Sequence, residues 1–169
     1  MTRSHSRMAK TLHWGFIAVF IFALTKQLDE VEELEDAALL QYEMIFASVF
    51  LLLLIGRFLY MQLTVPSVLP RETPRQITLL ARAVHLGMYA GMALIALSGM
   101  AIGLLYGAGE KSGPGMDLWL LVHEIAVNGS FTLIFVHIAA ALYHRRRRDG
   151  LWDAMVPFWP EKKKSEEPA

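Results

Sequence analysis

Four long apolar segments constrain this chain more than any other feature. They cover approximately residues 11–27, 38–62, 77–106 and 118–144. Each is long enough to cross the hydrocarbon core of a bilayer, about 30 Å, as a helix. With 54% hydrophobic residues in a chain of only 169, there is more apolar material than a small soluble core can bury. The sequence therefore predicts an all-α integral membrane four-helix bundle, with one domain over residues 1–150 and a tail over 151–169 whose end is disordered.

The charged residues are segregated between the two ends of the expected bundle. Cytoplasmic loops of membrane proteins carry an excess of Lys and Arg, whereas the sequence DEVEELED after the first segment is acidic. We therefore expect both termini and the tail in the cytoplasm. The run that follows the fourth segment is typical of a stop-transfer signal in contact with anionic lipids, so no nucleic-acid partner is expected. The basic residues are Arg3, Arg7 and Lys10 before the first segment, Arg71 and Arg75 between the second and third, and Arg145–Arg148 after the fourth.

Two histidines, His123 and His137, lie fourteen residues apart in the fourth segment. Fourteen helical residues rise about 21 Å and fall about 40° short of four full turns, so both imidazoles face one way at opposite depths. This is the geometry for two haems stacked across a membrane, and His13 in the first segment is a candidate second ligand. A single intramembrane histidine can also bridge helices through hydrogen bonds. Because the chain lacks cysteine, any haem would be held non-covalently, as in a b-type cytochrome.

These residues carry a resemblance that covers nearly the whole chain. The sequence is similar to the prokaryotic cytochrome b561 family, whose relatives include superoxide oxidase and the cytochrome b subunits of formate dehydrogenase and nickel–iron hydrogenase. The resemblance implies a multi-pass protein of the bacterial inner membrane that holds two b haems. It also implies that His13 and His137 ligate the cytoplasmic haem and that His123 ligates the periplasmic one. The matching features are His13-Trp14, His85, His123-Glu124, HIAAALYH over residues 137–144 and MVP over residues 155–157.

The second ligand of the periplasmic haem departs from the family pattern. The family places it in the second helix, fourteen residues before an arginine, and counting back from Arg57 reaches Glu43 in a segment without histidine. Glu43 or Met44 can serve as an unusual axial ligand, His123 can hold a five-coordinate haem, or this haem is missing. The two side chains project about 100° apart, so only one can face the iron. We expect an outer haem with altered ligation, although Met44 can simply pack in the bundle and Glu43 can carry a proton or pair with an arginine of another chain.

Further polar residues suggest a quinone site near the cytoplasmic haem. His85 and His144 lie within about two turns of that level and can hydrogen-bond a quinone carbonyl or relay protons. Arg57 and Arg82 can pair with haem propionates or instead snorkel to lipid phosphates. Small residues in the third segment, Gly87, Gly91, Gly99 and Gly103, are spaced for close helix packing.

Three classes of function follow from these expectations. We favour a membrane b-type cytochrome, an oxidoreductase or an electron-transfer subunit of one, that exchanges electrons between a periplasmic donor or docked redox protein and the quinone pool. The acidic stretch Asp29–Asp36 favours a basic protein partner and repels anionic superoxide. The alternatives are a stand-alone superoxide:ubiquinone oxidoreductase and a structural or assembly subunit, in a larger membrane complex, that has lost the outer haem.

Overall fold

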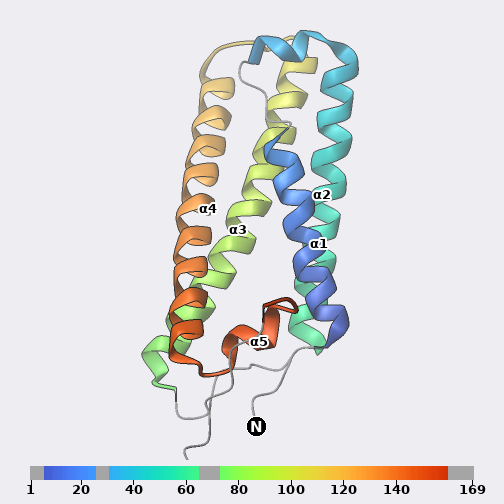
Figure 1. The fold of residues 1–169 in the computed structure, drawn as a ribbon. Coiled ribbons are helices and arrows are strands. Elements are labelled where there is room, and N and C mark those ends of the chain that lie inside the picture. Colours follow the sequence, from blue (N-terminus) through green and yellow to red (C-terminus); the bar gives the residue numbers. More distant parts are fainter. Residues whose placement is uncertain (1–5, 26–30, 65–72, 160–169) are drawn as a thin grey trace, which may run out of the picture.

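The computed structural model describes residues 6–25, 31–64 and 73–159. Its long helices lie side by side, with the start of α1 and the short α5 at one end of the bundle and η1 at the other (Figure 1). Within these ranges four helices are long and apolar enough to cross a membrane and no strand is present, which confirms the prediction of an all-α fold with four such segments. The side of the membrane on which the termini lie stays a prediction. The elements are α1 (Arg7–Leu24), η1 (Val31–Glu35), α2 (Ala37–Thr64), α3 (Arg75–Gly107), α4 (Pro114–Arg147) and α5 (Leu151–Met155).

The helices extend beyond the apolar stretches that predict them. Helix α1 begins at Arg7 because the hydroxyl of Ser6 accepts a hydrogen bond from the Ala9 amide at 3.1 Å, which satisfies one of the free donors of the first turn. Helix α4 begins with Pro114, which suits a first helical position. Its far end continues through three arginines, because basic side chains are favourable in the last turn of a helix.

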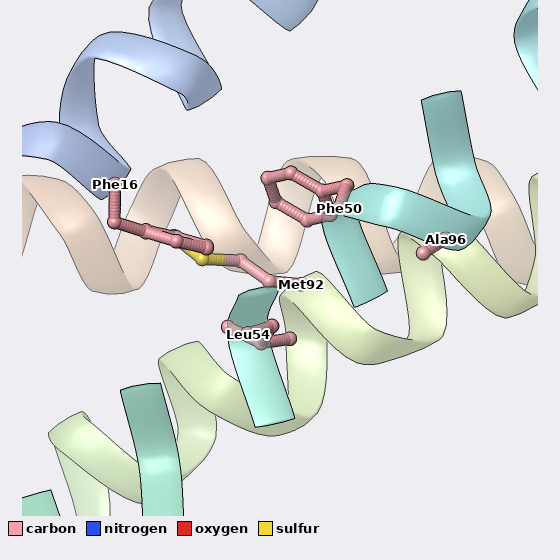
Figure 2. Packing of buried hydrophobic residues seen from close by; sticks show 5 residues of the cluster. All are labelled: Phe16, Phe50, Leu54, Met92 and Ala96. Carbon is pink, nitrogen blue, oxygen red and sulfur yellow. The ribbon is translucent and has the colours of Figure 1, made fainter. Parts of the chain in front are cut away.

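Helix α3 packs against both α2 and α4, whereas α1 packs against α2 and α5. Several glycines of α3 lie where side chains of α2 or α4 pack closely against the α3 backbone. A Cβ atom added to Gly103 would lie 2.6 Å from the Met44 sulfur, and one added to Gly91 would clash with the Ser130 hydroxyl. The small-residue spacing therefore does mark close helix contacts. Between the levels of Gly91 and Gly103, Met92 and Ala96 of α3 join an apolar core that three of the helices share, formed by Phe16, Phe50, Leu54, Met92 and Ala96 (Figure 2).

The end of the bundle with α5 is basic, and we call it the basic end. After α4 the chain turns back at Gly150 (φ 83°), and Ala154 of α5 is buried. Lys10 donates a hydrogen bond to the Asp153 carbonyl at 2.8 Å, and the Trp14 indole donates one to the Met155 carbonyl at 3.2 Å. The first part of the expected tail is therefore docked on α1. The remainder, residues 160–169, for which we expect disorder, lies outside the described residues.

The opposite end is acidic, and we call it the acidic end. Leu34 of η1 is buried there in a cluster with side chains of α3 and α4. Lys111 forms an ion pair with Glu35 at 2.9 Å, and the hydrogen bond between them raises the pKa of Lys111 above its usual value. Lys111 is the one basic residue at this end within the described ranges. The acidic residues described there are Glu33, Glu35, Asp36, Glu110 and Asp117.

Candidate functional site

Three histidines from three helices come together in the half of the bundle nearer the basic end. The ring centroids of His13 on α1 and His137 on α4 are 6.5 Å apart. The His85 ring on α3 lies closer to His137, at 4.9 Å between centroids. An imidazole nitrogen lies about 2 Å from the metal ion it ligates, so two rings on opposite sides of one iron have centroids about 6 Å apart. His13 and His137 are therefore separated by the distance that a single haem iron requires.

Arg57 of α2 forms hydrogen bonds to His13 of this group and to Tyr89 of α3. Its Nη2 atom donates to Nδ1 of His13 at 2.8 Å, and its Nη1 atom donates to the Tyr89 hydroxyl at 2.8 Å. The Nε atom is buried and has no hydrogen-bond partner. Because a guanidinium only donates, Nδ1 of His13 must accept in this arrangement, which places the proton of a neutral ring on Nε2. Ligation through Nε2 thus requires Arg57 to turn to another acceptor.

The surroundings of Arg57 call for an anion. The ion pairs among the described residues are Lys111 with Glu35 and His144 with Asp149, so no described carboxylate neutralises this guanidinium. An unpaired charge among apolar helices is costly. A haem propionate would supply the missing acceptor and would release His13 for the iron. The residues present therefore fit a haem held by His13 and His137, with Arg57 at a propionate.

A bare metal ion fits this part of the molecule less well. Within the described ranges, no group of three or more His, Cys, Asp or Glu side chains is arranged to hold one. Haem iron differs, because the macrocycle supplies the equatorial ligands and the protein needs to supply only axial ones.

The other predicted residues of this half are Arg82, His144 and His85, of which His85 neighbours His137. Arg82 is exposed on α3 and makes no hydrogen bond to another described residue. Nδ1 of His144 is 2.6 Å from a carboxylate oxygen of Asp149, which joins the end of α4 to the turn before α5. His85 is exposed, and its Nδ1 donates to the Ala81 carbonyl at 2.6 Å. Its Nε2 atom is then left with a lone pair, as a proton relay requires.

His123 lies against α3 in the half nearer the acidic end. Its Nδ1 atom is 2.9 Å from the Ser98 hydroxyl, and a Cβ atom added to Gly99 would lie 3.6 Å from its Cε1 atom. Gly99 and Gly103 are one helical turn apart, so Met44, which packs at Gly103, lies near the level of His123. No hydrogen bond within the described chain joins His123 to α2.

Glu43 and Met44 differ in their surroundings. The Met44 sulfur fills the notch that Gly103 leaves in α3, which is ordinary packing. Glu43 has a carboxylate oxygen, Oε1, that is buried without a hydrogen-bond partner. A buried polar atom without a partner is costly. Of the two candidate ligands on α2, Glu43 is therefore the one whose side chain still lacks an explanation.

Two polar contacts of the site were not predicted from the sequence. Tyr89 bonds Arg57, and Ser98 bonds His123. Tyr89 follows His85 by four residues and so shares its face of α3, and Ser98 directly precedes Gly99 of the small-residue pattern. The sequence therefore indicates the helix face of Tyr89 and the glycine pattern next to Ser98, but it does not indicate which side chain each residue bonds.

One of three comparisons with known proteins finds a match. A family model described as prokaryotic cytochrome b561 matches residues 4–158, nearly the whole chain. No curated protein and no solved structure matches the chain.

Proposed function

The chain belongs to the prokaryotic cytochrome b561 family of membrane haem proteins that transfer electrons, and on this premise we propose that it exchanges electrons between a redox partner at its acidic end and a quinone near its basic end. The observation that carries the proposal is the 6.5 Å separation of the His13 and His137 rings on two different helices. When bound there, haem iron supplies reversible one-electron transfer. The basic end would face the cytoplasm of a bacterial inner membrane, following the bias of Lys and Arg.

Each residue near His137 has a role in this proposal. His13 and His137 hold the iron, and Arg57 holds a propionate while Tyr89 fixes the position of its guanidinium. His85 neighbours His137 and would pass protons to and from a bound quinone. His144, paired with Asp149, would bring those protons from the basic end, because an imidazole can both accept and donate a proton.

The outer haem is assigned to His123 with Glu43 as the second axial ligand. Three observations support this assignment. Glu43 has a buried oxygen without a hydrogen-bond partner, and Met44, the next residue, packs against Gly103. Gly103 in turn lies one helical turn from Gly99, which His123 contacts. A carboxylate ligand carries negative charge and so favours the ferric state.

The redox partner is assigned from the charge of the acidic end. The side chains described there include five carboxylates and one lysine, which is already paired with Glu35. Opposite charge raises the rate at which partners meet, so a basic soluble redox protein is favoured over anionic superoxide.

The test uses the purified full chain in lipid nanodiscs. Added quinol should reduce the haem, and a basic c-type cytochrome should then reoxidise it at a rate that falls as salt rises. An acidic redox protein of similar potential serves as the control and should react slowly. Rapid reduction by superoxide, with no dependence on a basic partner, would favour the superoxide oxidase alternative. Haem that quinol fails to reduce would contradict the proposal and favour the structural-subunit alternative.

Substituting Arg57→Gln should lower the midpoint potential of the inner haem. Loss of a positive charge close to the iron disfavours the electron-rich ferrous form, by on the order of tens of millivolts at an effective dielectric constant near 20. A redox titration followed by visible absorbance measures this shift. Arg82→Gln is the matched control, since Arg82 is exposed and should have little effect. Equal shifts in the two variants would contradict the assignment of Arg57 to a propionate.

A further inference from the structure

We propose that Ser98 is a positioning residue that fixes the tautomer of His123, so that Nε2 of this imidazole carries the lone pair available to a haem iron. The inference rests on the proposed outer haem and adds a residue that acts on the haem through its ligand. Ser98 has no exposed surface although it lies in a helix long and apolar enough to cross the membrane. Most buried side-chain hydroxyls form at least one hydrogen bond, because water cannot reach them.

The Ser98 hydroxyl has three close neighbours. Its Oγ atom is 2.6 Å from the Leu94 carbonyl oxygen, 3.1 Å from the Ile95 carbonyl oxygen and 2.9 Å from Nδ1 of His123. A hydroxyl carries one proton, and carbonyl oxygens can only accept. The short contact to Leu94, one turn back along α3, is the usual partner of a serine within a helix. The proton of Ser98 therefore points to the carbonyl oxygens of its own helix.

The direction of the third hydrogen bond follows from this. With its proton directed at the backbone, Oγ offers a lone pair to His123, so Nδ1 must carry the proton and donate it. In a neutral imidazole the other nitrogen, Nε2, is then unprotonated. Nε2 is also the ring nitrogen farther from Gly99, because Gly99 lies against the Cε1 and Nδ1 atoms of the ring. The ring is thus held by its Nδ1 edge, and Nε2 keeps the lone pair.

The two ends of the bundle differ in this respect. At His13 the partner of Nδ1 is Arg57, which donates, whereas at His123 the partner accepts. An acceptor at the outer nitrogen of a ligating imidazole fixes its tautomer and raises its basicity. A more basic ligand stabilises ferric iron. Loss of the Ser98 hydroxyl should therefore raise the midpoint potential of the haem bound by His123 and leave the inner haem unchanged.

The experiment compares three serine variants of the full, haem-loaded chain. Ser98→Ala should weaken binding of the outer haem by about 10- to 100-fold, the usual effect of removing a partner of a ligating histidine, and should shift its midpoint potential upward. Ser98→Thr keeps the hydroxyl and should retain the wild-type potential. Ser130→Ala is the matched control, because Ser130 is equally buried in α4 but its Oγ atom has no hydrogen-bond partner. The readouts are haem titration, redox titration and the electron paramagnetic resonance spectrum of the ferric protein.

Each outcome decides the inference. An upward shift confined to one haem in Ser98→Ala, with wild-type potentials in Ser98→Thr and Ser130→Ala, supports it. An unchanged potential in Ser98→Ala, or an equal shift in Ser98→Thr, overturns it, because packing and not the hydroxyl would then matter. His123→Ala separates this failure from that of the proposed function. If that variant retains the wild-type haem content, the outer haem itself is wrongly assigned, and the role of Ser98 falls with it.

Discussion

Substituting His137→Ala should remove the haem at the basic end and lower the haem-to-protein ratio by about one. The reason is that α4 then offers no imidazole opposite His13, and a single histidine on α1, itself bonded to Arg57, has to hold the iron alone. The ratio is measured by the pyridine haemochromogen assay, and reduced-minus-oxidised spectra report whether the remaining haem is six-coordinate. The expected loss is all or none because no other histidine of α4 lies at this level.

His85→Ala is the control that makes this result informative. His85 lies closer to His137 than His13 does, at 4.9 Å against 6.5 Å between ring centroids. It is exposed, however, and its Nδ1 is bonded to the Ala81 carbonyl. We expect His85→Ala to keep its haem content while slowing reduction by quinol. Loss of haem in His85→Ala together with its retention in a His13→Ala variant would show that the iron lies between α3 and α4.

The architecture was predictable because it depends on segment length and hydropathy. Four stretches long enough to cross a bilayer became four helices, and the fourteen-residue spacing placed His123 and His137 in opposite halves of one helix. The ends of the helices were less predictable. Helix α4 continues through Arg147 and α3 begins at Arg75, because polar residues next to an apolar segment remain helical when nothing breaks the backbone.

The site was predictable only in part, for a physical reason. Periodicity states which residues share a face of one helix, but the contact between Arg57 and His13 depends on how two helices are rotated against each other. The same holds for Ser98 and His123, where a serine in an apolar helix carries no sign of a partner 25 positions away. The docking of α5 on Trp14 was missed because five residues are too few for a periodic pattern.

The choice between Glu43 and Met44 shows what packing adds to such a pattern. The sequence indicates that the two side chains diverge and that only one can face an iron. In the structure the Met44 sulfur fills the notch at Gly103, so its position is explained without a ligand. Glu43 keeps a buried oxygen without a partner. The packing of Met44 and the missing hydrogen bond of the Glu43 carboxylate are both consistent with ligation by Glu43.

Glu43→Ala should therefore open the sixth coordination position of the outer haem. The reduced variant should bind carbon monoxide with a strong spectral change, whereas the wild-type protein, with the proposed pair of ligands at each haem, should bind it weakly. Met44→Leu is the matched control at the neighbouring position: it nearly conserves volume at the Gly103 notch, a change that cores tolerate well. This variant should bind no more carbon monoxide than the wild type.

The pattern of carbon monoxide binding discriminates among the ligand sets. Binding gained in Met44→Leu but not in Glu43→Ala would make the thioether the ligand, which would favour ferrous iron and raise the potential. Binding already complete in the wild type would mean that His123 alone holds the outer haem, so that small ligands reach the iron from the acidic end. If Glu43 is the ligand, Glu43→His should instead give a bis-histidine spectrum and leave carbon monoxide excluded, because an imidazole at this position recreates the ligand pair proposed for the other half of the bundle.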